Sequence, residues 1–148
     1  MWWLSRKRLA RHFDQARVRR SIEEAERRTS GEIVVSVAPY FLGNIQRAAE
    51  RAFVRLGISQ TRHRNGVFFF IVPGRRQFVV LGDVAIHRRV GPDFWEGVAH
   101  AVSQRFRTGD MSGGLVDGIQ EVARRLAEHF PYDPAGDVNE LSDEPAIV

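Results

Sequence analysis

A hairpin between residues 61 and 83 constrains the fold of this chain more than any other segment. Residues 67–72 are six consecutive apolar side chains, a run too short to span a membrane and suited to a strand covered on both faces. Pro73 and Gly74 then reverse the chain, and residues 77–81 return beside the first run. We therefore predict a β-hairpin with its tip at residues 73–76, whose open ends bring Asn65 and Asp83 together.

The remaining segments predict one more strand and several helices. Residues 33–37 are rich in β-branched side chains and read as a strand. Residues 45–56 carry apolar side chains at helical spacing after Asn44, a typical N-cap. Further helices are expected in three places. The first ends at residue 28 and has a break near Ser21, and the second runs from residue 92 to about 106 with Trp95 in its apolar stripe. The third follows residue 110.

This order of elements predicts an α/β fold, a three-layer α/β/α sandwich around a small mixed sheet. The first two strands and the helix between them form a βαβ unit, which makes those strands parallel, and the hairpin adds an antiparallel third strand. Helices on both faces explain why every strand is apolar on both sides. At 148 residues we expect one domain, at residues 18–131, with an N-terminal arm at 1–17 and a flexible tail at 132–148.

Charged residues are distributed unevenly along the chain, and their distribution limits the kinds of partner that we expect. The formal net charge is +4, and residues 1–28 hold nine Lys or Arg against four acids. This basic arm, with Trp2 and Trp3, fits an anionic membrane surface or the acidic patch of a protein partner. Residues 131–148 hold five acids and no Lys or Arg, as in a flexible tail. No nucleic-acid readout motif accompanies the charge, so we expect no specific nucleic acid.

Two further features concern location and chemistry. The chain has no cysteine, which excludes disulfides and thiolate metal sites. Its first residues do not follow the order of a secretory signal, and no run is apolar for long enough to cross a bilayer, so we expect a cytoplasmic protein.

The predicted strand directions gather polar residues at one edge of the sheet. The N-terminal ends of the two parallel strands and the C-terminal end of the third strand meet there, which places Glu32, the loop at residues 61–65 and Asp83 together; we call this set the polar edge. A tight connection to the next helix adds Asp93. Glu32, Asp83 and Asp93 are candidate ligands of Ca²⁺ or Mg²⁺, which prefer oxygen donors. Thr61, Arg62, Arg64 and Asn65 are candidates for supporting this site or for binding phosphate.

The same residues also fit structural roles. Glu32 fits an ion pair with Arg62 or Arg64, Asp83 fits a cap on the following turn, and Asn65 fits turn geometry before Gly66. No phosphate-cradling loop, dinucleotide fingerprint, nucleophile elbow or HExxH motif occurs. No catalytic residue is therefore assigned from the sequence.

The chain nevertheless resembles the TPM domain family. The matching segments, in order, are TSGEIVVSV (29–37), FVRLGI (53–58), TRHRNGVFFFIV (61–72), FVVLGDVAI (78–86), VGPDFW (90–95), FRTGD (106–110) and GLVDGI (114–119) with HFP at 129–131. The chain is most similar to the small stand-alone bacterial members, whose relatives include plant thylakoid proteins associated with photosystem II repair and acid phosphatase activity, and an animal protein that modulates a receptor channel.

What the resemblance implies is a compact α/β/α sandwich, acid-phosphatase-like hydrolysis as a candidate activity, and binding of calcium or another divalent cation on acidic loops. Carried onto this sequence, it marks Glu32 of SGEI and Asp83 of LGD as the candidate metal or catalytic residues. Asp110 of TGD matches a further family position, but we place it at the other end of the helices, as a helix cap.

Overall fold

The computed structural model describes residues 14–38, 41–134, 141 and 145–147. The prediction of a membrane- or partner-binding arm at residues 1–17, including Trp2 and Trp3, lies almost wholly outside the described residues.

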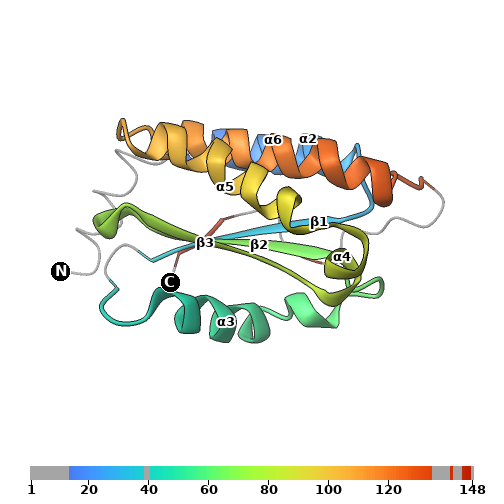
Figure 1. The fold of residues 1–148 in the computed structure, drawn as a ribbon, viewed down its shortest axis with the longest axis horizontal. Helices are drawn as coiled ribbons and strands as arrows, with labels where there is room; N and C mark the ends of the chain where they lie inside the picture. The colour runs from blue at the N-terminus through green and yellow to red at the C-terminus, as the bar shows by residue number, and fades with distance from the viewer. Residues whose placement is uncertain (1–13, 39–40, 135–140, 142–144, 148) are drawn as a thin grey trace.

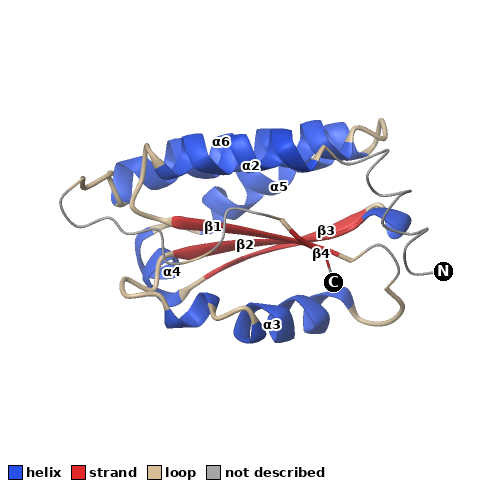
Figure 2. Cartoon of the chain, turned by 180° about the vertical axis from the view of Figure 1, so that it is seen from behind, coloured by secondary structure: helices blue, strands red, loops and turns tan. Residues whose placement is uncertain are grey.

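A four-stranded mixed sheet organises the described part of the chain, in the order β3-β2-β1-β4. β1 (Glu32–Val37) and β2 (Gly66–Val72) are parallel, and β3 (Gln77–Gly82) runs antiparallel to β2. The predicted hairpin and strand directions are confirmed. β4 (Ala146–Ile147) pairs parallel with β1, as the view from behind shows (Figure 2). This two-residue strand falls within the segment predicted as a tail and was not anticipated.

Helices cover both faces of the sheet, which confirms the predicted three layers (Figure 1). One face carries α2 (Gln15–Glu26), α5 (Pro92–Phe106) and α6 (Met111–His129). The other carries α3 (Ile45–Arg55), which begins at the predicted cap: the Asn44 side chain accepts a hydrogen bond from the Arg47 backbone N–H at 2.9 Å. Three short helices complete the described part of the chain: η1 (Ile58–Gln60), η2 (Pro73–Arg75) and α4 (Val84–Arg89).

The sheet divides the core into two apolar clusters. Alternate side chains of β1 and β2, such as Ile33 and Phe69, pack beneath α2, α5 and α6, while Val34 and Phe68 pack against α3. Every residue of β1 and β2 is buried, which is the physical reason for their continuous apolar character. β3 is less buried because it forms an edge of the sheet.

The helices differ from prediction at three points. α2 runs unbroken through Ser21, which is buried inside it, so the predicted break is wrong. Packing against α6 keeps the helix continuous at this potential cap. The buried stripe of α5 contains Phe94, with Trp95 only partly buried beside it. The connection from Asp83 to the next helix, expected as a turn and a tight loop, contains the helix α4.

Gly114 and Gly118 explain how α6 lies so close to its neighbours. A Cβ atom at Gly114 would stand 2.9 Å from the Val102 backbone oxygen of α5, and one at Gly118 would meet the side chains of Val102 and Phe69. Both glycines thus allow α6 to approach α5 and the sheet closely.

Candidate functional site

The polar edge forms as the strand directions predict. Glu32 stands opposite Gly66 in the parallel β1–β2 register, and the Asp83 backbone N–H donates to the Gly66 carbonyl at 3.0 Å. Gly66, the first residue of β2, therefore lies between the two acidic residues, with Glu32 on the β1 side and Asp83 on the β3 side. Their exposed fractions are 5% for Glu32 and 4% for Asp83, so both carboxylates are held in a largely desolvated environment.

Asp83 has two structural partners. Its side chain accepts a hydrogen bond from the Val84 backbone N–H at 2.7 Å as the N-cap of α4. It also receives two hydrogen bonds from Arg64, at 2.7 Å from Nε and 2.9 Å from Nη2. The pKa of Arg64 is raised above its ordinary value, chiefly because its guanidinium donates these bonds to the Asp83 carboxylate. A cation that binds Asp83 must therefore compete with Arg64.

The loop before β2 is fastened to the segment before β1. The Glu32 backbone N–H donates to the Asn65 carbonyl at 3.3 Å, and the Asn65 side-chain amide donates to the Ser30 carbonyl at the same distance. Arg64 adopts a left-handed backbone conformation with φ of 50°. Thr61 is buried, and its hydroxyl has no hydrogen-bond partner among the described residues. The loop thus holds one buried polar atom with capacity for a ligand.

The third predicted metal ligand lies on a different element. Asp93 is exposed in the first turn of α5, beyond α4 and its connection. Within the described ranges, no group of three or more His, Cys, Asp or Glu side chains is placed to hold a metal ion. Asp110 caps α6, accepting from the Gly113 backbone N–H at 2.9 Å, as expected.

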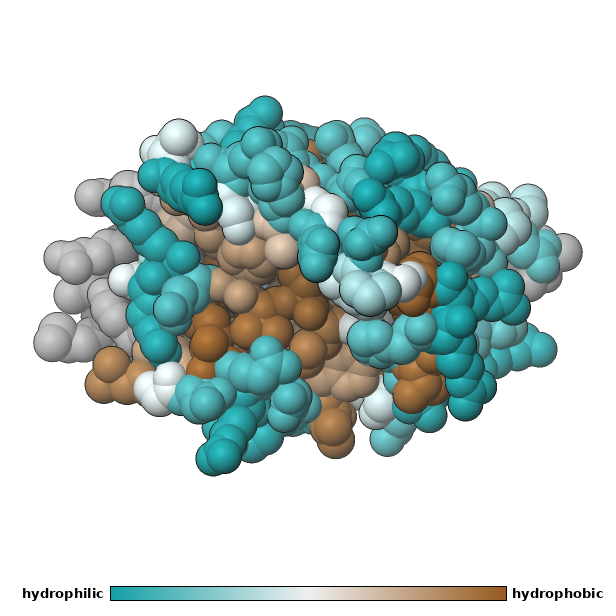
Figure 3. Space-filling view, viewed as in Figure 1, coloured by the Kyte–Doolittle hydropathy of each residue, from teal (hydrophilic) through white to brown (hydrophobic). Residues whose placement is uncertain are grey.

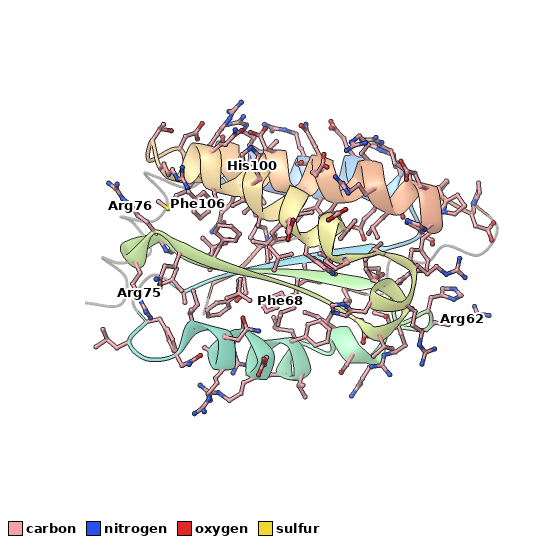
Figure 4. The ribbon with its side chains drawn as sticks, in the orientation of Figure 1. Arg62, Phe68, Arg75, Arg76, His100 and Phe106 are labelled. Carbon is pink, nitrogen blue, oxygen red and sulfur yellow. The ribbon has the colours of Figure 1, made fainter. Side chains whose placement is uncertain are left out.

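A pocket of about 640 Å³ opens on the outer side of the polar edge. We call it the basic pocket because its described lining contains three arginines and two histidines against a single acidic residue. Arg62 and His63 come from the polar-edge loop, and Arg62 points outward at the right-hand end of the molecule (Figure 4). The full lining is Ser30, Arg62, His63, Ala85, Arg88, Arg89, His129, Phe130, Pro131 and Asp133.

Contacts between three segments hold the wall of the basic pocket together. Arg89 of α4 donates to the His129 carbonyl at 3.5 Å, and its guanidinium carbon lies 5.2 Å from the centre of the Phe130 ring. The Phe130 carbonyl accepts from the Ser30 backbone N–H at 2.9 Å and also from the Thr29 hydroxyl. These contacts fix the positions of the pocket's segments relative to the polar edge.

Most of the basic pocket was not predicted from the sequence. Arg88 and Arg89 were not predicted as site residues because α4 is only six residues long and shows no helical periodicity, and His129 was not because it lies on another element, at the end of α6. The sequence does contain a signal for this short helix. An acidic residue, Asp83, stands at the N-cap position and basic residues follow in the last turn, at His87, Arg88 and Arg89, which is the charge order that the helix dipole favours.

Fold and site together define a class of protein: a small α/β/α sandwich with a buried acidic strand-end edge beside a basic surface pocket. The chain matches the TPM domain family over residues 9–125 and belongs to that family. No curated protein matches it. Among the described residues, no helix is both long and apolar enough to cross a membrane.

Two solved structures resemble the chain. The BA42 protein from the psychrophilic bacterium Bizionia argentinensis, solved by NMR, is 30% identical with a TM-score of 0.86, covering 90% of this chain and 92% of its own. The N-terminal domain of the cg2496 protein from Corynebacterium glutamicum is 15% identical with a TM-score of 0.61, covering 75% of this chain and 70% of its own. The second likeness concerns the fold alone.

Proposed function

We propose that this TPM domain binds a phosphate-bearing anion in the basic pocket. The observation that carries the proposal is the lining, in which Arg62, Arg88 and Arg89 face a common pocket with Asp133 as the one acidic residue among those that the structure describes there. Guanidinium groups form two parallel hydrogen bonds to phosphate oxygens and keep their charge at all ordinary pH values.

The build of the pocket supports this assignment. Arg89 lies against the Phe130 ring and a backbone carbonyl, so part of the cost of ordering its long side chain is met before a ligand arrives. The volume of about 640 Å³ exceeds what inorganic phosphate alone requires and suits a phosphate ester.

Calorimetric titration with inorganic phosphate tests the proposal. We expect saturable binding by the full chain, and loss of at least roughly tenfold in affinity in Arg88→Gln/Arg89→Gln, because hydrogen bonds to charged groups contribute about 1.5–3 kcal/mol each. Arg47→Gln/Arg51→Gln removes the same charge from α3 on the opposite face and is the matched control. Equal affinity in the two double variants would show that only net charge attracts the anion.

The polar edge supports a second candidate, a divalent cation such as Ca²⁺ or Mg²⁺. Glu32 and Asp83 are buried carboxylates at one edge, and the buried Thr61 hydroxyl, in the loop before β2, has no hydrogen-bond partner in the described part of the chain. A cation bound there would lie next to an anion in the basic pocket and would polarise a phosphoryl oxygen or activate a water molecule, giving weak phosphatase activity.

Competition with Arg64 makes the cation hypothesis testable. Calcium or magnesium should raise the melting temperature of the full chain by mass action. Asp83→Asn should abolish this rise, while Arg64→Gln should enlarge it by freeing the carboxylate that Arg64 occupies. A rise that is the same in both variants would place the cation elsewhere. Magnesium-dependent hydrolysis of p-nitrophenyl phosphate, lost in Asp83→Asn, is the corresponding activity assay.

A further inference from the structure

The edge strand β3 lacks the features by which proteins protect an open sheet edge. Among the strands that the structure describes, its only neighbour in the sheet is β2. Residues Gln77–Gly82 contain no charged residue and no proline, and six consecutive pairs with β2 leave no bulge. Charges, prolines and bulges are the usual means of preventing another strand from adding to such an edge.

The β3 edge is also apolar on its visible side. Phe78 and Val80 pack only partly into one core cluster, and Val79 and Leu81 only partly into the other. The space-filling view shows apolar surface in the middle of the molecule, between the helices above and α3 below, where β3 runs (Figure 3).

The backbone hydrogen bonds of β3 alternate in direction. The Asp83 N–H bonds to the Gly66 carbonyl, which fixes the phase of the ladder, so Gln77, Val79 and Leu81 bond to β2. Phe78, Val80 and Gly82 consequently direct their N–H and C=O groups away from the sheet. Among the described residues none forms a hydrogen bond to these groups.

Near the two ends of this strand, α5 carries exposed side chains of opposite charge. α5 runs counter to β3: Trp95 meets Gly82 at one end, and the Phe106 ring lies 5.3 Å from the Phe78 ring at the other. Glu96 is therefore exposed near the end of β3, while Arg107 and Arg76 border a pocket of about 290 Å³ at its start. Figure 4 shows Arg76 at the hairpin end of the molecule, opposite Arg62.

We propose that β3 is the interface of a symmetric homodimer, in which two copies of this chain pair antiparallel through β3 and form one continuous sheet. A two-fold axis at Val80 sets Phe78 opposite Gly82 of the second copy, and each facing pair exchanges two hydrogen bonds. The same axis brings Arg107 of one copy beside Glu96 of the other, twice, so the surface is complementary to itself. The opposite edge ends in the two-residue β4, too short to continue the assembly, so growth stops at two.

Light scattering coupled to size exclusion, over a range of concentrations, measures the proposed dimer. Each of the single variants Glu96→Arg and Arg107→Glu would place like charges side by side at both symmetric contacts between the two copies. Each should therefore raise the dimer dissociation constant roughly tenfold. The double variant Glu96→Arg/Arg107→Glu restores opposite pairs and should return the constant to near that of the unaltered chain. A single exchange of Glu50→Arg on α3 is the control and should have no effect.

Amide hydrogen exchange identifies the strand itself. Protection at Phe78, Val80 and Gly82 should rise with protein concentration, while Val79 and Leu81, already bonded to β2, should change little and serve as internal controls. A chain that stays monomeric at millimolar concentration, with the three outward amides unprotected, overturns the proposal and leaves β3 to a strand of another protein. A dimer indifferent to the charge exchanges and without new protection in β3 overturns it as well.

Discussion

The contact between α5 and α6 gives the sharpest stability prediction, for Gly114→Ala. A Cβ atom at Gly114 would stand 2.7 Å from a Phe106 ring carbon and 2.9 Å from the Val102 backbone oxygen. The backbone of α5 cannot turn aside as a flexible side chain would. Overpacking a core costs about 1–3 kcal/mol, while replacing a helical glycine with alanine gains about 1 kcal/mol. The strain should prevail, with a net loss of up to about 2 kcal/mol and a Tm lowered by up to roughly 8 °C.

Gly97→Ala is the matched control because the substitution is the same and the residue also lies inside a helix. Its new Cβ would meet only the guanidinium end of Arg125, at 2.8 Å, which can move away. We expect Gly97→Ala to be neutral or to stabilise the protein by up to about 1 kcal/mol. Urea unfolding followed by circular dichroism measures both variants. If Gly114→Ala is as stable as Gly97→Ala, the close approach of α5 and α6 is not as described.

Three further predictions concern single polar groups. Asp83→Ala should cost about 1 kcal/mol through the lost cap on α4, and Asp83→Asn less because it keeps an acceptor; equal losses in thermal unfolding would contradict the capping role. Ser36→Ala should be neutral or stabilising by up to about 1 kcal/mol, since its buried hydroxyl has no partner among the described residues; a clear loss would reveal one. Hydrogen bonds from Arg124 and Arg125 lower the pKa of Glu121 in the folded state, so its contribution is present above the unfolded-state pKa and lost as the pH falls through the lower folded value. Glu121→Gln should therefore lower the Tm slightly at pH 7 and not at pH 2–3, and a gap that persists in acid would contradict this.

The three longer strands of the sheet were predictable because each of them carries a local signal that agrees with its burial. Residues 67–72 are apolar throughout and prove to be buried on both faces, and Pro73-Gly74 stands at the turn. The polar edge followed from strand direction alone, which places Glu32 and Asp83 beside Gly66. Long periodic segments and turn residues thus sufficed for the topology.

The features that escaped prediction depend on contacts between distant segments. The continuity of α2 through Ser21 reflects packing against α6, which no local pattern encodes. β4 is two residues long and acquires its structure only by pairing with β1. Arg89 enters the basic pocket because α6 ends beside it, at His129 and Phe130, some forty residues later in the chain. Residue spacing could not reveal that contact.

Binding of a phosphate-bearing anion in the basic pocket is the central claim, and an NMR titration of the ¹⁵N-labelled chain with inorganic phosphate tests it most directly. The account predicts saturable shifts of the backbone amides of Ser30, His63, Arg88 and His129, which line the pocket, with α3 unaffected. Sodium chloride at equal ionic strength should not reproduce them. Phosphate that shifts no pocket amide, or shifts α3 as much, would contradict the claim.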